Sequence, residues 1–295
     1  MPELPEVETI RRHLAPYVEG RVLTALEVRD ERWCRPLAGE EVAAAVQGRR
    51  VEALGRRGKY LVWELEDDVH LMLHLRMTGT LLLDPPEPPR YARVRFGLDD
   101  GRELIFDDPR RFGTGELALG GEARDAFFAT RLGVEPFSAD FTSAHLYALT
   151  KVSRAPVKAF LLDQRKVAGV GNIYADEALF RARIHPLRPA GRLTRKQVAA
   201  LRDAVVASLE DGVAAKGASI DDFRHPDGVE GTFQHRFLIH LREGEPCLVC
   251  ERPVRKLRAA GRGTYVCERC QPRPRQAAAA RNSARRPERS AAASS

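Results

Sequence analysis

Four of the five cysteines form two tight pairs near the end of the 295-residue chain, in the segments CLVC and CERC. The pattern is C-x2-C-x16-C-x2-C, made by Cys247, Cys250, Cys267 and Cys270. Each pair presents two thiolates from one turn, and two such turns complete a tetrahedron around Zn²⁺. Four protein ligands leave no position for water, so the pattern predicts one structural zinc ion. Disulfides are the alternative, which a cytosolic chain disfavours.

Basic side chains are concentrated in the last 49 residues. Between positions 247 and 270, six Arg or Lys stand against two Glu, and from 271 to 295 six Arg stand against one Glu. This segment therefore holds more than the whole net charge of +7. Such concentration favours a polyanionic partner, with a merely solvated tail as the alternative. The cations between the cysteine pairs, where a zinc-held hairpin can present them to phosphates, include Arg255, Lys256, Arg258 and Arg262.

The segment KVAGVGNIYADEALF places Gly169 and Gly171 just before an amphipathic stretch. Glycines let a loop approach a phosphate closely, and the unpaired N–H groups of a helix start can then bind it. Nearby cations, among them Lys158, strengthen this interpretation. An ordinary turn is the alternative.

The elements that position these residues change along the chain. A helix is predicted from Pro5 to about Tyr17, because Val7, Ile10 and Leu14 share one face. A short helix is predicted at 40–48, and a hairpin turn at Asp99-Asp100-Gly101. Predicted strands cover residues 21–28, 59–66, 69–75, 80–84, 92–98 and 102–106. So many strands in the first part indicate a β-sandwich or a barrel.

Helices follow, predicted over residues 144–152, 157–167, 172–184 and 194–217 from apolar positions three or four apart. From about Phe233 two strands are expected to carry the paired cysteines. The chain is therefore predicted to be an α+β protein. The tail has low complexity and excess charge, which is typical of disorder. No apolar run approaches the roughly 18 residues of a membrane span, and the acidic N-terminus is unlike a signal peptide.

Five motifs together resemble the formamidopyrimidine-DNA glycosylases of bacteria: PELPEVE, HLRMTG, DPRRFG, GVGNIYADE and the four-cysteine segment. They run from position 2 to position 270 in the family's order. The resemblance implies an N-terminal β-sandwich with a leading helix, then a helix–two-turns–helix domain with a zinc-finger β-hairpin. We place these domains at residues 1–135, 136–232 and 233–271, followed by a disordered basic tail at 272–295.

The resemblance also implies catalytic roles. Met1 is removed, and Pro2 becomes an N-terminal secondary amine. Because α-amino groups titrate near ~8 against ~10.4 for lysine, more of this amine is a ready nucleophile at neutral pH. Glu3 matches the family's general acid/base, Lys59 its proton donor for β-elimination, and Arg262 its phosphate-gripping arginine assigned to δ-elimination. The alternative for Pro2, a residue that only helps to start a helix, suits Pro5 better.

DNA contacts follow from the same matches. A flipped base leaves a gap that side chains fill, and the three matching fillers are Met77, Arg110 and Phe112. The other DNA-binding positions are His74, Tyr91, Arg154, Lys158 and Asn172. Three departures from the family pattern stand out. Arg76 occupies a position commonly held by glycine, Tyr91 one where histidine is expected, and residues 217–240 differ from strict 8-oxoguanine enzymes.

The sequence thus predicts a bifunctional DNA glycosylase and abasic-site lyase that removes oxidised purines, 8-oxoguanine and formamidopyrimidines, in base excision repair. We expect a cytoplasmic, nucleoid-associated monomer that binds damaged double-stranded DNA and no membrane. One alternative is an endonuclease VIII-type enzyme for oxidised pyrimidines, which Leu4 and an intact DPRRFG disfavour. A second is an inactive damage-binding protein of this fold. A zinc-ribbon transcription factor leaves the N-terminal motif unexplained.

Overall fold

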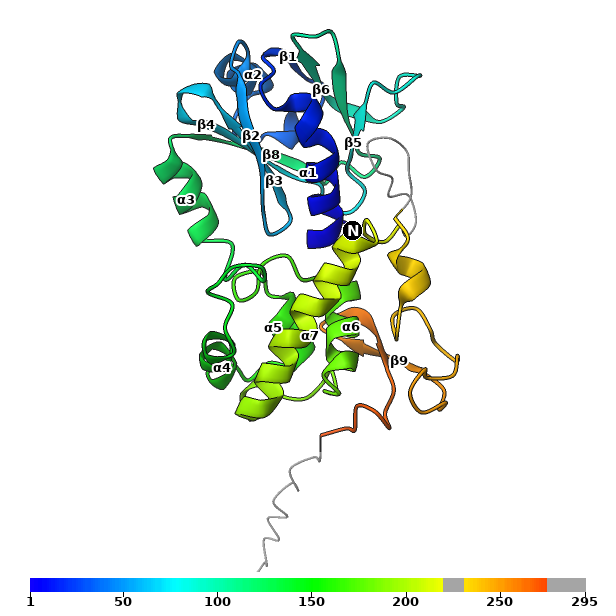
Figure 1. Cartoon of the computed structure of the whole chain (residues 1–295). Helices are drawn as coiled ribbons and strands as arrows, with labels where there is room; N and C mark the ends of the chain where they lie inside the picture. Colours follow the sequence, from blue (N-terminus) through cyan, green and yellow to red (C-terminus); the bar gives the residue numbers. More distant parts are fainter. Residues whose placement is uncertain (220–230, 275–295) are drawn as a thin grey trace, which may run out of the picture.

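The computed structural model describes residues 1–219 and 231–274. Figure 1 shows two parts, a β-sandwich above and a group of helices with a short hairpin below. This is the predicted α+β fold, and it has the predicted order of parts. No helix in the described ranges is long and apolar enough to cross a membrane. From position 275 on, the predicted disordered tail lies outside the described residues, and the predicted domain limits stay predictions.

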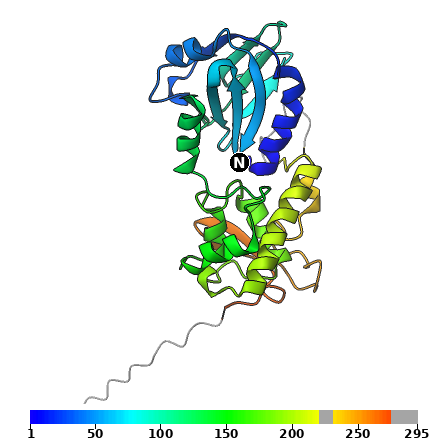
Figure 2. The ribbon, with the colours of Figure 1, turned by 60° about the vertical axis from the view of Figure 1, so that its left-hand side comes forward.

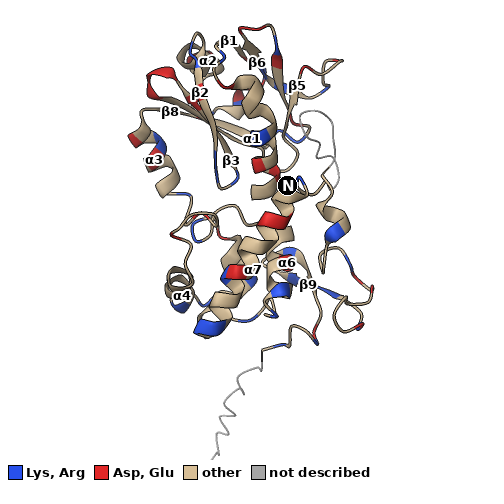
Figure 3. Cartoon of the chain, viewed as in Figure 1, with Lys and Arg blue, Asp and Glu red and all other residues tan. Residues whose placement is uncertain are grey.

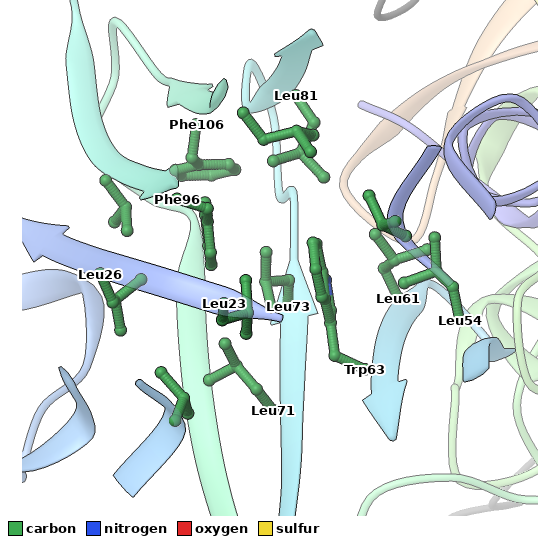
Figure 4. Packing of buried hydrophobic residues seen from close by; sticks show 14 of the residues in the cluster. Leu23, Leu26, Leu54, Leu61, Trp63, Leu71, Leu73, Leu81, Phe96 and Phe106 are labelled. Carbon is green, nitrogen blue, oxygen red and sulfur yellow. The ribbon is translucent and has the colours of Figure 1, made fainter. Parts of the chain in front are cut away.

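Two four-stranded antiparallel sheets form the sandwich, in the orders β1-β6-β7-β5 and β2-β3-β4-β8. The strands are β1 (Leu23–Val28), β2 (Val51–Arg57), β3 (Tyr60–Leu65), β4 (Val69–His74), β5 (Thr80–Leu83), β6 (Ala92–Leu98), β7 (Glu103–Asp107) and β8 (Thr114–Leu119). Their inward side chains meet in one apolar core, where the rings of Trp63 and Phe96 stack with centroids 5.4 Å apart (Figure 4). Burial of this core holds the sheets together.

The six predicted strands and the β6–β7 hairpin are confirmed, with Gly101 in its turn at φ 87°. The sequence analysis missed β2 and β8. Their residues have weak strand propensity, since β2 ends on two arginines and β8 contains Gly115 and Glu116. They are strands because pairing fixes them, with Leu54 opposite Trp63 and Leu117 opposite Leu71. Tertiary contacts outweighed local preference.

Helix α1 (Leu4–Val18) joins the two parts. Its Val7, Ile10 and Leu14 lie in the sandwich core, whereas Leu4 lies in the core of the helical part. Figure 2 shows the N-terminus between the parts, beside the contact of α1 with α7 (Arg195–Ala214). The first residues of the chain are therefore held at the junction by burial on both sides.

The remaining helices are α2 (Gly39–Val46), α3 (Gly121–Ala129), α4 (Ser143–Lys151), α5 (Val157–Leu162) and α6 (Asn172–Arg181), with 3-10 turns at Glu31–Trp33, Glu66–Asp68, Ala190–Arg192 and Phe233–Arg236. The helix predicted over 157–167 was wrong beyond Leu162. There the side chain of Asp163 accepts the N–H of Arg165 at 3.2 Å, a local bond that competes with helix continuation. Helix α3 was not predicted.

The two strands expected near the cysteines are β9 (Arg255–Ala259) and β10 (Arg262–Val266). Arg262 lies opposite Ala259, so a two-residue turn of Ala260 and Gly261 connects the strands. Both turn residues have positive φ, 50° and 73°, as the tight hairpin turn requires. The turn places Arg262 at the first position of β10.

Candidate active site and nucleic-acid interface

A cleft of about 170 Å³ lies where the sandwich meets the helical part. It is lined by Met1, Pro2, Glu3, Glu6, Met77, Asn172, Ile173, Ala218, His240 and Arg262. These residues come from the start of the chain and α1, the β4–β5 turn, the start of α6, the segment after α7, the segment before the zinc hairpin, and strand β10 of that hairpin. The structure therefore brings the N-terminal motif, HLRMTG, GVGNIYADE and the four-cysteine segment to one place.

Pro2 and Glu3 form the inner wall of this cleft. Pro2 is buried, and in the chain as described its nitrogen is the amide of the Met1–Pro2 bond. Glu3 is 2% exposed, and its Oε1 accepts the N–H of Ile173 at 3.0 Å, the second residue of α6. Its Oε2 has no hydrogen-bond partner among the described residues. One oxygen thus fixes the carboxylate, and the other is left for a proton or a ligand.

The glycine turn holds this carboxylate. A Cβ on Gly171 would lie 2.2 Å from Cδ of Glu3, so only glycine admits the carboxylate here. The carbonyl of Gly169 accepts the N–H of Leu4 at 3.1 Å. In the described structure the protein's own N-terminus fills this turn, and a phosphate contact there stays a prediction. The anion at the start of α6 is Glu3.

Glu6 is a residue of this site to which the sequence analysis gave no role. Its Oε2 accepts the N–H of Glu3 at 2.8 Å, and its Oε1 accepts the hydroxyl of Tyr174 and the N–H of Ala218, each at 2.8 Å. Burial, then the nearby Glu3 carboxylate, raises the pKa of Glu6. Its place three residues after Glu3 is the capping-box signal that could have revealed the first contact.

Lys59 lies at the β2–β3 turn and is 4% exposed. Burial lowers the pKa of its ammonium, and the carboxylates of Glu3 and Glu6 partly offset this. Glu135 fixes the turn, since its Oε2 accepts the N–H of Gly58 at 2.9 Å. A lysine with a lowered pKa exchanges protons more readily near neutral pH.

The three predicted gap fillers lie on two loops. The guanidinium of Arg110 lies 4.9 Å from the ring centroid of Phe112, which is 52% exposed. Arg110 is also exposed, and Met77 is half-buried at the cleft. A large apolar ring open to solvent is available for insertion between bases.

His74 and Tyr91 lie near the same edge of the sandwich. The Nδ1 of His74 accepts the N–H of Arg76 at 3.0 Å, and burial lowers the pKa of the ring to about 3. His74 is thus neutral and can offer DNA an Nε2–H hydrogen bond but no charge. Tyr91 is half-buried between the guanidinium groups of Arg90 and Arg93. Arg76 has φ 56°, the left-handed backbone that explains why glycine suits its position.

The structure pairs Lys158 inside the protein, and its predicted phosphate contact stays a prediction. Lys158 has no exposed surface, and its Nζ donates to Asp176 and to the hydroxyl of Thr264, each at 2.7 Å. Asp176 also contacts His240 Nδ1 at 2.8 Å. This buried group links α5 and α6 to the zinc hairpin, because a buried ammonium must be paired. The sequence analysis gave no role to Asp176, although it lies in the motif GVGNIYADE, and none to His240.

Asn172 bonds within the protein, whereas Arg154 is exposed to solvent. The side-chain N–H of Asn172 donates to the carbonyl of Gly263 at 3.1 Å, so it holds β10 in this structure. The predicted phosphate contact of Asn172 stays a prediction. Arg154, in the α4–α5 connection, and Arg262 are both exposed. In the segment expected to close over the lesion, residues 220–230 lie outside the described residues.

The four cysteine sulfurs lie within 4.8 Å of one another. Cys250 and Cys267 are 3.4 Å apart and Cys247 and Cys270 are 3.9 Å apart, too far for disulfides. A tetrahedral zinc ion with Zn–S bonds of about 2.3 Å needs sulfurs roughly 3.8 Å apart. The residues fit one zinc ion, as predicted. Figure 3 shows basic segments on the hairpin it would hold and acidic ones near the start of α1.

Family models match three parts of the chain. They are the formamidopyrimidine-DNA glycosylase N-terminal domain at residues 1–115, the H2TH domain of the same glycosylase at 132–224, and a zinc finger found in FPG and IleRS at 244–273. The formamidopyrimidine-DNA glycosylase of Chloroflexus aurantiacus is 44% identical over 275 residues, which cover 92% of this chain and 98% of the relative.

Solved structures of formamidopyrimidine-DNA glycosylases are similar to this chain as well. The MutM (Fpg) protein of Thermus thermophilus matches with a TM-score of 0.83 and 45% identity, over 92% of this chain and 98% of that one. The Lactococcus lactis Fpg bound to DNA with an abasic site matches with a TM-score of 0.85 and 33% identity, over 92% and 100%. The same Lactococcus protein is described, at 33% identity and TM-score 0.85, with DNA containing an oxidised pyrimidine, again over 92% and 100%.

Proposed function

The chain belongs to the formamidopyrimidine-DNA glycosylase family, and from this premise we propose that the cleft around Pro2 carries out its chemistry. The protein is a DNA glycosylase of DNA repair, with the abasic-site lyase activity that is part of the family. The observation that carries the residue assignment is the position of Glu3. Its buried carboxylate is fixed through one oxygen, and the other oxygen has no partner among the described residues. Glu3 directly follows Pro2, the proposed nucleophile, in the chain.

The first step is nucleophilic attack by Pro2 after removal of Met1. The lone pair of the proline nitrogen bonds to C1′ of the damaged nucleotide, and the glycosidic bond breaks with its electron pair leaving on the base. The base takes up a proton. The new ammonium group gives its proton to the Glu3 carboxylate. Glu3 then protonates the sugar ring oxygen as the C1′–O bond opens, which leaves an iminium between proline and C1′.

Strand cleavage follows from this iminium. A proton is lost from C2′, the C3′–O bond breaks, and the 3′ phosphate leaves. Lys59 transfers protons in this β-elimination. A second elimination removes a proton from C4′ and breaks the C5′–O bond, with the exposed Arg262 holding the phosphate. Water then hydrolyses the iminium and restores the proline amine.

The DNA-contacting residues act before the chemistry. Met77 and Phe112 would enter the gap left by the flipped nucleotide, and Arg110 would offer its donors to the orphaned cytosine. Arg154 would add charge to the phosphate contacts, and His74 and Tyr91 neutral hydrogen bonds. The zinc ion, when bound, would fix the hairpin that presents Arg262. Because the four cysteines would fill every ligand position of the metal, it would have a structural role and take no part in the reaction.

Damaged double-stranded DNA is the partner, by analogy with the DNA complexes of the Lactococcus protein. The substrate class is oxidised purines, because PELPEVE and DPRRFG are intact. The oxidised-pyrimidine complex of the same relative makes oxidised pyrimidines the second candidate. The protein would act as a monomer in the cytoplasm, associated with the nucleoid and not with a membrane.

Borohydride trapping on an oligonucleotide with an abasic site tests the proposal. Wild type should give a covalent adduct that Pro2→Gly weakens, whereas Pro5→Ala, at a proline whose nitrogen is always an amide, should trap as wild type does. Mass spectrometry of the active protein should show that Met1 is absent. Retained Met1, or equal trapping by Pro2→Gly, would refute the assignment. A panel of oxidised purines and pyrimidines in duplexes then decides the substrate class.

A further inference from the structure

The loop that carries Met77 and the loop that carries Arg110 and Phe112 lie side by side. The first connects β4 to β5 and the second connects β7 to β8, so both cross between the two sheets. Strand pairing aligns their ends, because His74 lies opposite Thr114 and Thr80 opposite Asp107. The two loops, although distant in sequence, thus lie at the same end of the sandwich.

One carboxylate joins the two loops. Asp108 is 1% exposed, and its Oδ1 accepts the hydroxyl of Thr78 at 2.5 Å and the N–H of Arg110 at 3.2 Å. Its Oδ2 accepts the N–H groups of Phe112 at 2.9 Å and Gly113 at 2.8 Å. The N–H of Arg110 also reaches the Thr78 hydroxyl at 3.4 Å. Four donors from both loops satisfy this buried side chain.

These contacts fix the residues that carry the gap-filling side chains. The backbone N–H groups of Arg110 and Phe112 and the hydroxyl next to Met77 all end on Asp108. We propose that Asp108 and Thr78 are positioning residues that hold Met77, Arg110 and Phe112 as one rigid wedge for extruding the damaged nucleotide. This inference rests on the proposed function, which gives the three side chains their place in the duplex.

The physical reason is the cost of opening the duplex. Extrusion loses base stacking and pairing, which inserted side chains must replace. Loops already fixed against each other lose little conformational freedom on insertion, so more of the contact energy remains for extrusion. Attack by Pro2 makes no use of the Thr78–Asp108 bond. Extrusion and covalent chemistry should therefore separate in variants.

Thr78→Val removes the hydroxyl and keeps the shape of the side chain, and Thr78→Ser is its matched control. Two substrates separate the steps: a duplex with the oxidised purine that wild type excises fastest, and a single-stranded oligonucleotide with an abasic site, which needs no extrusion. Loss of one buried hydrogen bond should slow single-turnover excision from the duplex about tenfold in Thr78→Val. Thr78→Ser should retain most of the rate, and all three proteins should trap the single strand equally.

A fluorescent base analogue next to the lesion gives a second readout, since its emission rises on unstacking. This rise should be slower in Thr78→Val than in Thr78→Ser. Asp108→Asn, which places an amide against four donors, should show a larger loss on the duplex alone. Equal duplex rates for Thr78→Val and Thr78→Ser, or equal losses on both substrates, would overturn the inference. Failure of wild type to trap the single strand would instead refute the proposed function.

Discussion

The floor and the rim of the cleft satisfy their polar groups in different ways. By floor we mean Pro2, Glu3 and Glu6 of the cleft together with Lys59, which interacts with both carboxylates. By rim we mean Met77 and Arg262 of the cleft together with Arg110 and Phe112 on the adjoining β7–β8 loop. The floor side chains that ionise are 2–4% exposed, and those of Glu3 and Glu6 bond to backbone N–H groups of the protein. On the rim, Arg110 and Arg262 are exposed and Phe112 is 52% exposed.

This difference follows from what each region has to do. Groups that move protons need a fixed geometry, which burial and internal hydrogen bonds supply before any ligand arrives. Burial also raises the pKa of Glu6 and lowers that of Lys59. Groups that receive DNA must keep donors and apolar surface unused until the complex forms. The backbone of the rim is therefore fixed, by Asp108 in the loops and by strand pairing in the zinc hairpin. The ends of its side chains stay available for DNA.

The largest expected effect is on the floor. Glu3→Gln keeps the contact with the N–H of Ile173 but cannot exchange protons. Loss of a general acid/base should lower single-turnover base excision by about 10²–10⁴-fold. Glu52→Gln, at an exposed glutamate of β2, should match wild type. If Glu3→Gln excised within tenfold of wild type, the floor would not be the proton-transfer site.

Lys59→Met should slow strand cleavage by about 10²-fold or more, measured by gel analysis at a preformed abasic site. It should also raise stability at pH 7, because burial lowers the pKa of Lys59 below its ordinary 10.5. The folded state then binds fewer protons than the unfolded chain between the lowered pKa and 10.5, so unfolding free energy rises with pH there. That rise should shrink in Lys59→Met. A variant less stable than wild type at pH 7 would contradict this account.

Removal of zinc tests the rim. Chelation, or Cys267→Ser with Cys270→Ser, should free the hairpin and weaken DNA binding at least tenfold, since one charge-assisted hydrogen bond contributes about 1.5–3 kcal/mol. The sandwich has a separate core and should stay folded, as circular dichroism can show. Unchanged affinity after verified metal loss would exclude the hairpin from DNA binding.

Arg154→Ala and Lys158→Met compare an exposed with a buried cation. Arg154→Ala should weaken DNA binding a few-fold and reduce the slope of log affinity against log salt by about 0.9. Lys158→Met should leave that slope unchanged but destabilise the protein by about 3–5 kcal/mol, because Asp176 loses its partner. A reduced slope in Lys158→Met would support the phosphate contact predicted from sequence.

The smallest effect is expected from Arg76→Gly beside the rim. Relief of the left-handed backbone at φ 56° should stabilise the fold by about 1 kcal/mol or less, measured by denaturant unfolding. DNA binding should weaken at the same time if Arg76 approaches phosphates. Lower stability in this variant would show that the arginine side chain outweighs the strain.

Much of the fold could be predicted, since α1, six strands and the helices α4, α6 and α7 follow apolar periodicity. Strands β2 and β8 could not, because their pairing partners determine them. For the site, the sequence placed Pro2, Glu3, Met77 and Arg262 in motifs, and the structure gathers these in one cleft. The catalytic and DNA-contacting roles stay predictions.

What the sequence determined by itself is chemistry carried by residue type and short spacing. Four cysteines in two C-x2-C turns specify a zinc site, and a proline after the initiator methionine specifies a secondary amine once the methionine is removed. Only the tertiary structure decided which polar groups remain available to DNA. Lys158, Asn172 and the glycine turn fit phosphates by sequence, yet each is used by the protein itself. Their partners lie far along the chain, as Thr264 does from Lys158, and burial forces such groups to pair inside.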